Sequence, residues 1–283
     1  MVTIRELIRN AGEQLRSGGV ENYNFDARCI AESVLDMTHS QLIVHSGDTV
    51  DNSREAAVND LVQKRISGYP LQYLTGQWEF FGLPFYVGEG VLIPRQDTEL
   101  LVECVVNGSC NYKNPVIADL CSGSGCIAIS VNHELKEASV HAAELSEEAL
   151  KYLLKNVTLN DSDVTVHHGD VLDNSFVNSF PTCDIIVSNP PYLTPDDMNS
   201  LQKEVSFEPE MALAGGSDGL FFYRRITELW KHRLVKGGMI YYEIGAGQEN
   251  DVSDILSANG FCNIEFFYDL NHIIRVVSGK YKG

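Results

Sequence analysis

The tetrapeptide Asn189-Pro190-Pro191-Tyr192 combines groups that could hold a flat NH2 group. The Asn189 side-chain oxygen can accept one N–H of that group, and the Pro190 carbonyl can accept the other. The prolines restrict the backbone, so both acceptors are held in place before a substrate arrives. The Tyr192 ring offers a face for a planar group. The sequence therefore predicts a substrate site made of all four residues, with Asn189, Pro190 and Tyr192 as the catalytic ones.

The chemistry that suits such a site is transfer to an amide-type nitrogen. An amide nitrogen is conjugated with its carbonyl and is a poor nucleophile. Two acceptors placed off its plane favour a pyramidal nitrogen, whose lone pair can attack a carbon held in line at about 3 Å. A strong base is not needed first, because the proton can leave after the transfer. The exocyclic amino group of adenine is flat in the same way, so the tetrapeptide alone leaves both substrates open.

A glycine-rich turn, Cys121 to Gly125, follows the apolar segment 116–120. Glycines in such a turn let the backbone pass close to a ligand at the carboxyl edge of a sheet. Glu144 comes about 20 residues later, at the end of the next apolar segment, where a carboxylate can accept both hydroxyls of a ribose. The pattern predicts a pocket for a nucleoside-type ligand, and it also fits a dinucleotide-binding dehydrogenase.

The acidic residue Asp119 helps to decide between a dinucleotide and another nucleoside-type ligand. It ends a strand beside the turn, where a carboxylate opposes a pyrophosphate. The same carboxylate suits the ammonium and sulfonium groups of S-adenosylmethionine, directly or through water. We therefore expect S-adenosylmethionine rather than a dinucleotide.

The elements that must position these groups alternate from about residue 100. Strands are expected at 116–120, 140–145, 164–168, 184–188, 239–244, 264–268 and 273–277, and helices at 126–135, 146–156, 220–234 and 249–259. Alternation of strands and helices predicts a parallel, doubly wound sheet with ligands at its carboxyl edge. Only a short turn joins the last two strands, so we expect them to be antiparallel.

Three parts are expected along the chain. Residues 1–75 are a helical domain, residues 76–100 a β-hairpin linker with Gly82-Leu83 at its turn, and residues 101–283 the catalytic domain. Apolar residues at helical spacing predict three helices in the first part. The expected stripes are Ile4, Leu7, Ile8, Ala11 and Leu15, then Ala27, Ile30, Ala31, Val34 and Leu35, then Ala57, Leu61, Val62 and Ile66.

The composition argues against several classes of protein. The 283 residues carry 21 Lys and Arg against 39 Asp and Glu, a net charge of -18. A duplex nucleic-acid binder needs a basic face, so we expect no direct nucleic-acid binding. The acidity either only aids solubility or favours a basic protein partner. No apolar run approaches the roughly 18 residues of a membrane span, and no signal core opens the chain, so we expect a cytoplasmic protein.

The seven cysteines form no C-x-x-C pair. Three of them, Cys121, Cys126 and Cys183, lie in or beside apolar segments and are typical of small core residues in a reducing compartment. His167 and His168 are adjacent, so in a strand they would point to opposite faces. We expect neither a disulfide frame nor a metal site.

The whole chain resembles the HemK/PrmC family of protein-(glutamine amide) N-methyltransferases, which modify peptide chain release factors. Besides the tetrapeptide and the turn, four further stretches carry the resemblance. They are Pro70–Gly76 with Phe80, Val91–Glu99, Phe207–Leu213 with Gly215–Leu220, and Glu243–Gly245 with Gln248.

The resemblance implies a fold and a reaction. The fold is an α/β class I S-adenosylmethionine-dependent methyltransferase, Rossmann-like, with a seven-stranded sheet whose last strand is antiparallel, plus a small N-terminal helical bundle joined by a β-hairpin. The reaction methylates the glutamine of the Gly-Gly-Gln motif of class I release factors, with S-adenosyl-L-homocysteine as the other product. The helical domain would help to grip the factor, and we expect a monomer.

The resemblance also implies residue roles. Asn189 to Tyr192 would hold the substrate glutamine, and Glu144 takes the place of the usual ribose-binding Asp. Arg95 and Glu208 either order the substrate loop or form a structural ion pair. The expected donor site comprises Asp119, Cys121, Ser122, Gly123, Ser124, Gly125, Glu144, Asp170, Val171 and Asn189.

Two alternatives remain open at this point. An adenine N6-type DNA or RNA methyltransferase would use the same tetrapeptide, but it needs a basic groove and a way to flip the base. A binding module with a degenerate methyltransferase fold would need no catalysis at all. The intact turn, Glu144 and tetrapeptide argue against that module.

Overall fold

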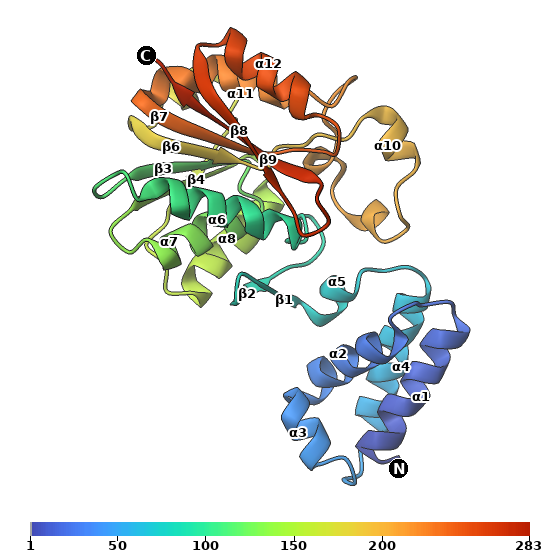
Figure 1. The fold of residues 1–283 in the computed structure, drawn as a ribbon. Helices are drawn as coiled ribbons and strands as arrows, with labels where there is room; N and C mark the ends of the chain where they lie inside the picture. The colour runs from blue at the N-terminus through green and yellow to red at the C-terminus, as the bar shows by residue number, and fades with distance from the viewer. Residues whose placement is uncertain (1) are drawn as a thin grey trace. The chain divides into compact units, whose positions relative to one another are not determined.

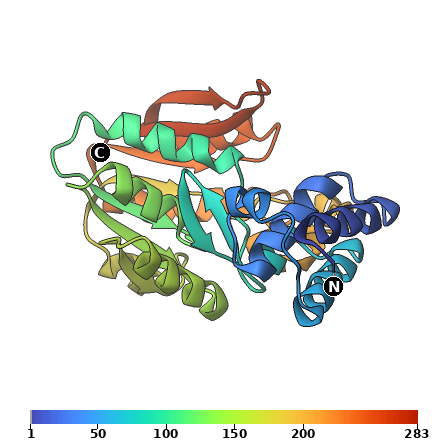
Figure 2. The same ribbon diagram turned by 90° about the horizontal axis from the view of Figure 1, so that it is seen from below.

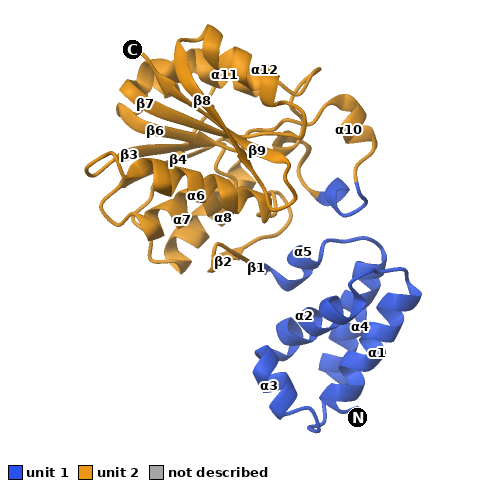
Figure 3. Cartoon of the chain, viewed as in Figure 1, with its two compact units in different colours: residues 1–77, 202–207 blue, residues 78–201, 208–283 orange. Residues whose placement is uncertain are grey.

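The computed structural model describes residues 2–283, which form two compact units (Figure 3). Unit 1 comprises the chain up to Gln77 together with a second segment, Gln202–Phe207. Unit 2 comprises Trp78–Leu201 and Glu208–Gly283. Within the described residues, no helix combines the length and the apolar character that crossing a membrane requires.

Unit 1 is a bundle of helices. They are α1 (Ile4–Ser17), α2 (Tyr23–Leu35), α3 (His39–Val44), α4 (Asn52–Ile66) and α5 (Leu71–Thr75). Helices α1, α2 and α4 pack against one another (Figures 1 and 2). Side chains that accept backbone N–H groups begin three of them, Thr3 before α1, Thr38 before α3 and Asp51 before α4. Most of the first two expected stripes are buried.

The third expected stripe is only partly right. The buried row of α4 consists of Val58, Val62 and Arg65, whereas Ala57 and Leu61 are half-buried. A charged residue occupies one core position, so the spacing of apolar residues could not reveal the true face of the helix. The difference shifts the buried face by about one residue.

Arg65 is buried because it joins two carboxylates inside unit 1. Its Nε donates to Asp26 Oδ2 at 2.6 Å, and its Nη2 donates to Glu204 Oε1 at 2.6 Å. Burial raises the pKa of Asp26, and the hydrogen bond from Arg65 acts in the opposite direction. The ring of Phe207 packs edge-on against Tyr69, with centroids 5.2 Å apart. These contacts hold the segment 202–207 in the helical unit.

Unit 2 is built on a seven-stranded sheet. Its strands are β3 (Val116–Leu120), β4 (Ser139–Glu144), β5 (Thr165–His168), β6 (Cys183–Ser188), β7 (Leu234–Glu243), β8 (Phe261–Tyr268) and β9 (Ile274–Tyr281). The order across the sheet is β5-β4-β3-β6-β7-β9-β8 (Figure 1). Every neighbouring pair is parallel except those that β9 makes with β7 and β8. The expected α/β class, with an antiparallel strand closing the sheet, is confirmed.

Helices cover both faces of this sheet. They are α6 (Asp97–Ser109), α7 (Cys126–Glu134), α8 (Glu147–Leu159), α9 (Asn174–Ser179), α11 (Phe221–Trp230) and α12 (Glu249–Ala258). Helices α6, α7 and α8 share one apolar core with one face of the sheet, and α9, α11 and α12 share another with the opposite face. Helix α6 packs against β6, β7 and β9. A short helix, α10 (Pro195–Asn199), follows the tetrapeptide.

Three local expectations differ from the structure. Helix α11 ends at Trp230 and a 3-10 turn follows, so β7 begins at Leu234, inside the expected helix 220–234. Gly237 and Gly238 lie within β7, where its register beside β6 is irregular. Helix α6 was not foreseen, and its first turn lies in the stretch that was expected to be linker. The hairpin of β1 (Gln77–Phe80) and β2 (Leu83–Tyr86) turns at Phe81-Gly82, both at positive φ, rather than at Gly82-Leu83.

Candidate active site

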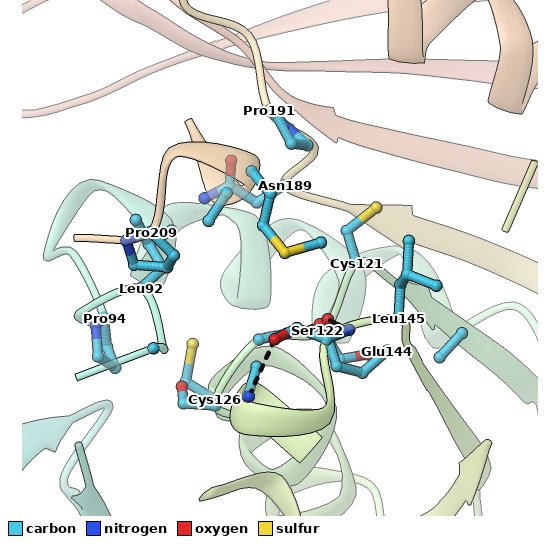
Figure 4. Close-up of a pocket in the computed structure, with 18 of the residues that line it drawn as sticks. Leu92, Pro94, Cys121, Ser122, Cys126, Glu144, Leu145, Asn189, Pro191 and Pro209 are labelled. Carbon is cyan, nitrogen blue, oxygen red and sulfur yellow. Dashed lines mark hydrogen bonds between the residues drawn. The ribbon is translucent and has the colours of Figure 1, made fainter. Parts of the chain in front are cut away.

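A pocket lies at the carboxyl edge of the sheet in unit 2. This is where a doubly wound sheet places its ligands. Figure 4 shows side chains from several separate segments converging on it. They come from the stretch before α6, the glycine-rich turn, the end of β4, the loop after β5, the tetrapeptide and the loop 209–212.

The glycine-rich turn supplies backbone and small side chains to one wall. Cys121, Ser122, Gly123 and Ser124 all line the pocket. Backbone hydrogen bonds hold the turn, from Ser122 N to the Ala143 carbonyl at 3.0 Å and from Gly125 N to the Ser122 carbonyl at 2.8 Å. The turn is therefore tied to β4, the neighbouring strand.

Gly125 does not line the pocket. It has φ 81° and begins α7, and a Cβ there would lie 2.2 Å from Leu153 Cδ1 of α8. The second glycine of the turn is thus required by helix packing and by its left-handed backbone, rather than by an approach to a ligand.

Glu144 ends β4 and is held from two sides. Its Oε2 accepts the Gly123 N–H and its Oε1 accepts the Ser146 N–H, both at 2.7 Å. Burial raises its pKa, and these backbone hydrogen bonds oppose the rise. Each carboxylate oxygen has a second lone pair, so the fixed group can still accept hydroxyls from a ligand.

Asp119 is fully buried and is not among the residues that line the pocket. It shares a face of β3 with Ile117, toward α7, because side chains alternate along a strand. Its Oδ2 accepts the Ala128 N–H at 3.2 Å, while its Oδ1 has no hydrogen-bond partner. Burial raises its pKa to about 7. The structure therefore places Asp119 behind the turn.

Asp170 and Val171, in the loop after β5, also line the pocket. Asp170 Oδ1 accepts the Leu172 N–H at 2.8 Å, which forms a tight turn after β5. The Val171 carbonyl accepts the indole N–H of Trp230 at 2.8 Å. The second oxygen of Asp170 remains available to a ligand.

Only two residues of the tetrapeptide line the pocket. Asn189 and Pro191 line the pocket, whereas Pro190 and Tyr192 do not. Tyr192 packs partly against the core beneath α11 and α12, and burial raises the pKa of its hydroxyl well above the usual range. The Asn189 Nδ2 donates to the Thr98 hydroxyl at 3.4 Å. Thr98, on α6, was not among the expected site residues.

Residues that do not line the pocket hold the backbone of the tetrapeptide in place. Gln248 Nε2 donates to the Tyr192 carbonyl at 3.2 Å, and its Oε1 accepts the Gly245 N–H at 2.9 Å. Gly215 N donates to the Leu193 carbonyl at 2.8 Å, and a Cβ on Gly215 would lie 2.5 Å from Tyr192 Cα. A glutamine is needed at position 248 to make both hydrogen bonds, and a glycine is needed at position 215 because a side chain there would collide with the Tyr192 backbone.

Glu208 joins two segments of the chain that line the pocket. Its side chain is 1% exposed, accepts the Ile93 N–H at 3.0 Å and forms an ion pair with Arg95. Ile93 and Arg95 line the pocket, and so does Pro209, the residue after Glu208. The expected partnership of Arg95 and Glu208 is present, and it connects two segments of the chain that line the pocket.

Replacing Glu208 by alanine is expected to lower kcat/KM about 10- to 100-fold. The change leaves the Ile93 N–H and the Arg95 guanidinium without their acceptor, so both segments loosen. Steady-state kinetics would measure the loss, and the exposed Glu210→Ala variant is the matched control. Wild-type kinetics in Glu208→Ala would show that this contact does not shape the pocket.

The donor groups of the pocket fit S-adenosylmethionine. Glu144 and Asp170 provide carboxylates for hydroxyl and amino groups, and Leu145, Val171 and Phe222 provide apolar surface for a base. Among the described residues that line the pocket, the one basic side chain is Arg95, which is paired with Glu208, whereas a pyrophosphate would favour unpaired basic groups. Within residues 2–283, no group of three or more His, Cys, Asp or Glu residues could hold a metal ion.

The sheet order, the turn and the acidic strand end define a class I methyltransferase fold. Among solved structures, the catalytic domain of hMettl16 in complex with the MAT2A 3'UTR hairpin 6 has a TM-score of 0.56 at 15% identity, covering 82% of this chain and 83% of that one. A methyltransferase from Pyrococcus furiosus has a TM-score of 0.52 at 16% identity, covering 81% and 98%. At such identities these structures show the fold alone.

Sequence comparison gives the family. A model described as the PrmC N-terminal domain matches residues 6–76, and one described as the methyltransferase small domain matches residues 95–209. Release factor glutamine methyltransferases are 37% identical in Clostridium acetobutylicum, over 97% of both chains, and 36% identical in Geobacter sulfurreducens, over 98% of this chain and 96% of that one. The chain belongs to the release factor glutamine methyltransferase family.

Proposed function

We propose that this protein transfers a methyl group from S-adenosyl-L-methionine to the side-chain amide nitrogen of a glutamine in class I peptide chain release factors. The glutamine is the one in the Gly-Gly-Gln motif. The observation that best supports the proposal is that Asn189 lines the same pocket as the glycine-rich turn and Glu144. An acceptor for the substrate and the groups for the donor thus meet in one cavity.

The donor is held by the turn, β4 and the loop after β5. Cys121 to Ser124 face its methionine part, Glu144 accepts the ribose hydroxyls, and Asp170 with Val171 flanks the adenine. When bound, S-adenosylmethionine supplies a methyl group on a cationic sulfur. Asp119, buried behind the turn, acts on the donor only through the turn that it supports.

The substrate amide is held by the tetrapeptide. The Asn189 side-chain oxygen accepts one amide N–H and the Pro190 carbonyl accepts the other. Both acceptors lie off the amide plane, so the nitrogen becomes pyramidal and its lone pair is directed at the methyl carbon. Tyr192 packs against the core outside the pocket, and its main-chain carbonyl, fixed by Gln248, keeps the Pro190 carbonyl in place. The surplus proton leaves to water after the transfer.

Each of the three parts of the chain has a role in this reaction. Residues 1–75 serve as the domain that grips the release factor, residues 76–100 as the hairpin linker, and residues 101–283 as the methyltransferase domain. The two glycines of the substrate motif carry no side chain, so the loop bearing the glutamine can enter a narrow pocket. The net charge of -18 favours a protein substrate over a nucleic acid.

Mass spectrometry of a release factor after incubation with enzyme and donor tests the proposal. We expect a gain of one methyl group on the glutamine of the Gly-Gly-Gln motif and none on a factor in which that glutamine is replaced by asparagine. Duplex DNA and structured RNA are offered in parallel. Methylation of adenine in either, with none on the factor, would replace the proposed function by an adenine N6-type activity.

Replacing Glu144 by glutamine is expected to weaken donor binding about 10- to 100-fold. One oxygen of the carboxylate becomes an NH2 group, which faces a backbone N–H at Gly123 or Ser146 and no longer accepts a ribose hydroxyl. Calorimetric titration with S-adenosylmethionine measures the change. The exposed Glu147→Gln, three residues along the chain and of equal charge change, is expected to bind as the wild type does. Equal affinities in both variants would remove Glu144 from the donor site.

A further inference from the structure

Asn189 has to present its oxygen, and not its NH2 group, to the substrate. The two ends of a carboxamide are nearly equal in size, and a half-turn about the last side-chain bond exchanges them. In the reversed orientation the Asn189 NH2 group would face the NH2 group of the substrate glutamine, and no hydrogen bond could form. Something in the protein must therefore fix the orientation.

The neighbours of Asn189 in the fold are Thr98 and Glu243. Ser188 pairs with Tyr242 in the parallel register of β6 and β7, so the next residues of the two strands, Asn189 and Glu243, lie side by side at the carboxyl edge. Thr98 is the second residue of α6, and its hydroxyl accepts the Asn189 Nδ2 at 3.4 Å. Glu243 and Thr98 are 3% and 2% exposed.

We propose that Glu243 and Thr98 set the orientation of the Asn189 carboxamide, so that its NH2 group faces the core and its oxygen faces the pocket. The inference rests on the proposed function. An ionised carboxylate only accepts hydrogen bonds, so it selects the NH2 end of Asn189. Thr98 is a positioning residue of the same kind, because its hydroxyl accepts from Asn189 while its proton is free for Glu243.

Glu243 is itself firmly placed. The Tyr223 hydroxyl donates to the Glu243 main-chain carbonyl at 2.9 Å, which fixes the end of β7.

The Oε2 atom of Glu243 is buried and has no hydrogen-bond partner. Burial raises the pKa of Glu243 to about 7, while hydrogen bonds from Thr98 and Asn189 act in the opposite direction. The carboxyl group thus changes its charge close to neutral pH.

The charge state of Glu243 decides which end of Asn189 it binds. Above its pKa the carboxylate accepts from the Asn189 NH2 group, and below it the protonated acid can donate to the Asn189 oxygen instead. The charged and titratable groups around Glu243 come from the other elements that pack there. They are Asp97 of α6, Cys126 of α7, Tyr192 after β6, Tyr223 of α11 and Arg275 of β9.

Most of these neighbours do not change charge near neutral pH. Burial raises the pKa of Cys126, Tyr192 and Tyr223, so these groups stay neutral. Asp97 and Arg275 form an ion pair at 3.1 Å. The pKa of Asp119, behind the glycine-rich turn, is also raised to about 7. A variant at position 243 is therefore needed to separate the two carboxyl groups.

Kinetics of Glu243→Gln, Thr98→Val and Thr98→Ser tests the inference. We expect kcat to fall about tenfold or more in Glu243→Gln and Thr98→Val, with donor affinity within twofold of the wild type. Thr98→Ser keeps the hydroxyl and recovers most of the loss. The wild-type kcat falls as pH is lowered from 8 to 6, and Glu243→Gln loses this dependence. The exposed Glu265→Gln is the matched control, with wild-type behaviour.

Nuclear magnetic resonance reads the orientation without turnover. The Asn189 side-chain NH2 signal is assigned by its absence in Asn189→Ala. It should shift as pH crosses 7 in the wild type and stay still in Glu243→Gln. Wild-type kcat in both Glu243→Gln and Thr98→Val, or an Asn189 signal that ignores both changes, overturns the inference. A wild-type protein that methylates no release factor overturns the proposed function instead, and the resonance shift still decides the orientation.

Discussion

Asn189→Ala is expected to lower kcat about 10²- to 10³-fold while the protein remains folded. The substitution removes a fixed acceptor that acts on the amide as it becomes pyramidal, and losing one such preorganised hydrogen bond costs about 3 to 4 kcal/mol of transition-state stabilisation. Asn189 is only partly buried, so its truncation opens no core cavity. Single-turnover kinetics with a release factor measures the effect on the chemical step.

The exposed Asn199→Ala, at the end of α10, is the control. It removes the same carboxamide ten residues away and is expected to keep wild-type rates. A normal circular dichroism spectrum for Asn189→Ala separates lost chemistry from lost structure. If Asn189→Ala and Asn199→Ala turned over equally fast, the side-chain oxygen of Asn189 would have no part in the reaction.

The second large effect is on stability. Arg65→Met is expected to destabilise the protein by about 3 to 5 kcal/mol, because it leaves Asp26 buried without its partner. The Asp26 and Arg65 side chains are 4% and 10% exposed, so water cannot replace the lost contact. The double change Asp26→Leu with Arg65→Met removes both charges and is expected to restore much of the loss. Urea unfolding followed by fluorescence measures these differences.

The deficit of Arg65→Met should also depend on pH. Without Arg65 the pKa of Asp26 in the folded state rises further above its value in the unfolded chain, because burial is no longer opposed. The folded state then binds a proton more tightly, and stability increases as pH falls through that raised pKa. The deficit is therefore smaller at pH 5 than at pH 8. The exposed Arg54→Met on the same helix should cost under about 0.5 kcal/mol at both values.

The succession of strands along the chain could be predicted because each apolar run is short and is followed by a turn or a helical pattern. The ends of β3, β4 and β6 gave the turn, Glu144 and Asn189, and these three do meet in one pocket. What the pattern could not give is the direction of a side chain at a strand end. Asp119 occupies the expected position but faces α7, away from the pocket.

Contacts between distant parts of the chain could not be predicted from the spacing of residues. Glu208 and Ile93 are 115 residues apart, and Arg65 and Glu204 are 139 apart. A charged residue on an expected apolar face, as at Arg65, looks like an interruption until its partner is known. Glu243 did leave a signal, since it is an acid that ends a long apolar strand, as Glu144 is. The resemblance marked the stretch but gave this residue no role.

The return of residues 202–207 to the helical unit affects how that unit can be exchanged between proteins. Its complete structure is encoded in two stretches separated by more than a hundred residues. A chimera that takes only the first stretch from a relative would set a foreign Arg65 environment against the native Glu204 and Phe207. Grafting the helical module therefore requires both stretches to be transplanted together. A substitution in one stretch also changes which residues the other stretch can tolerate.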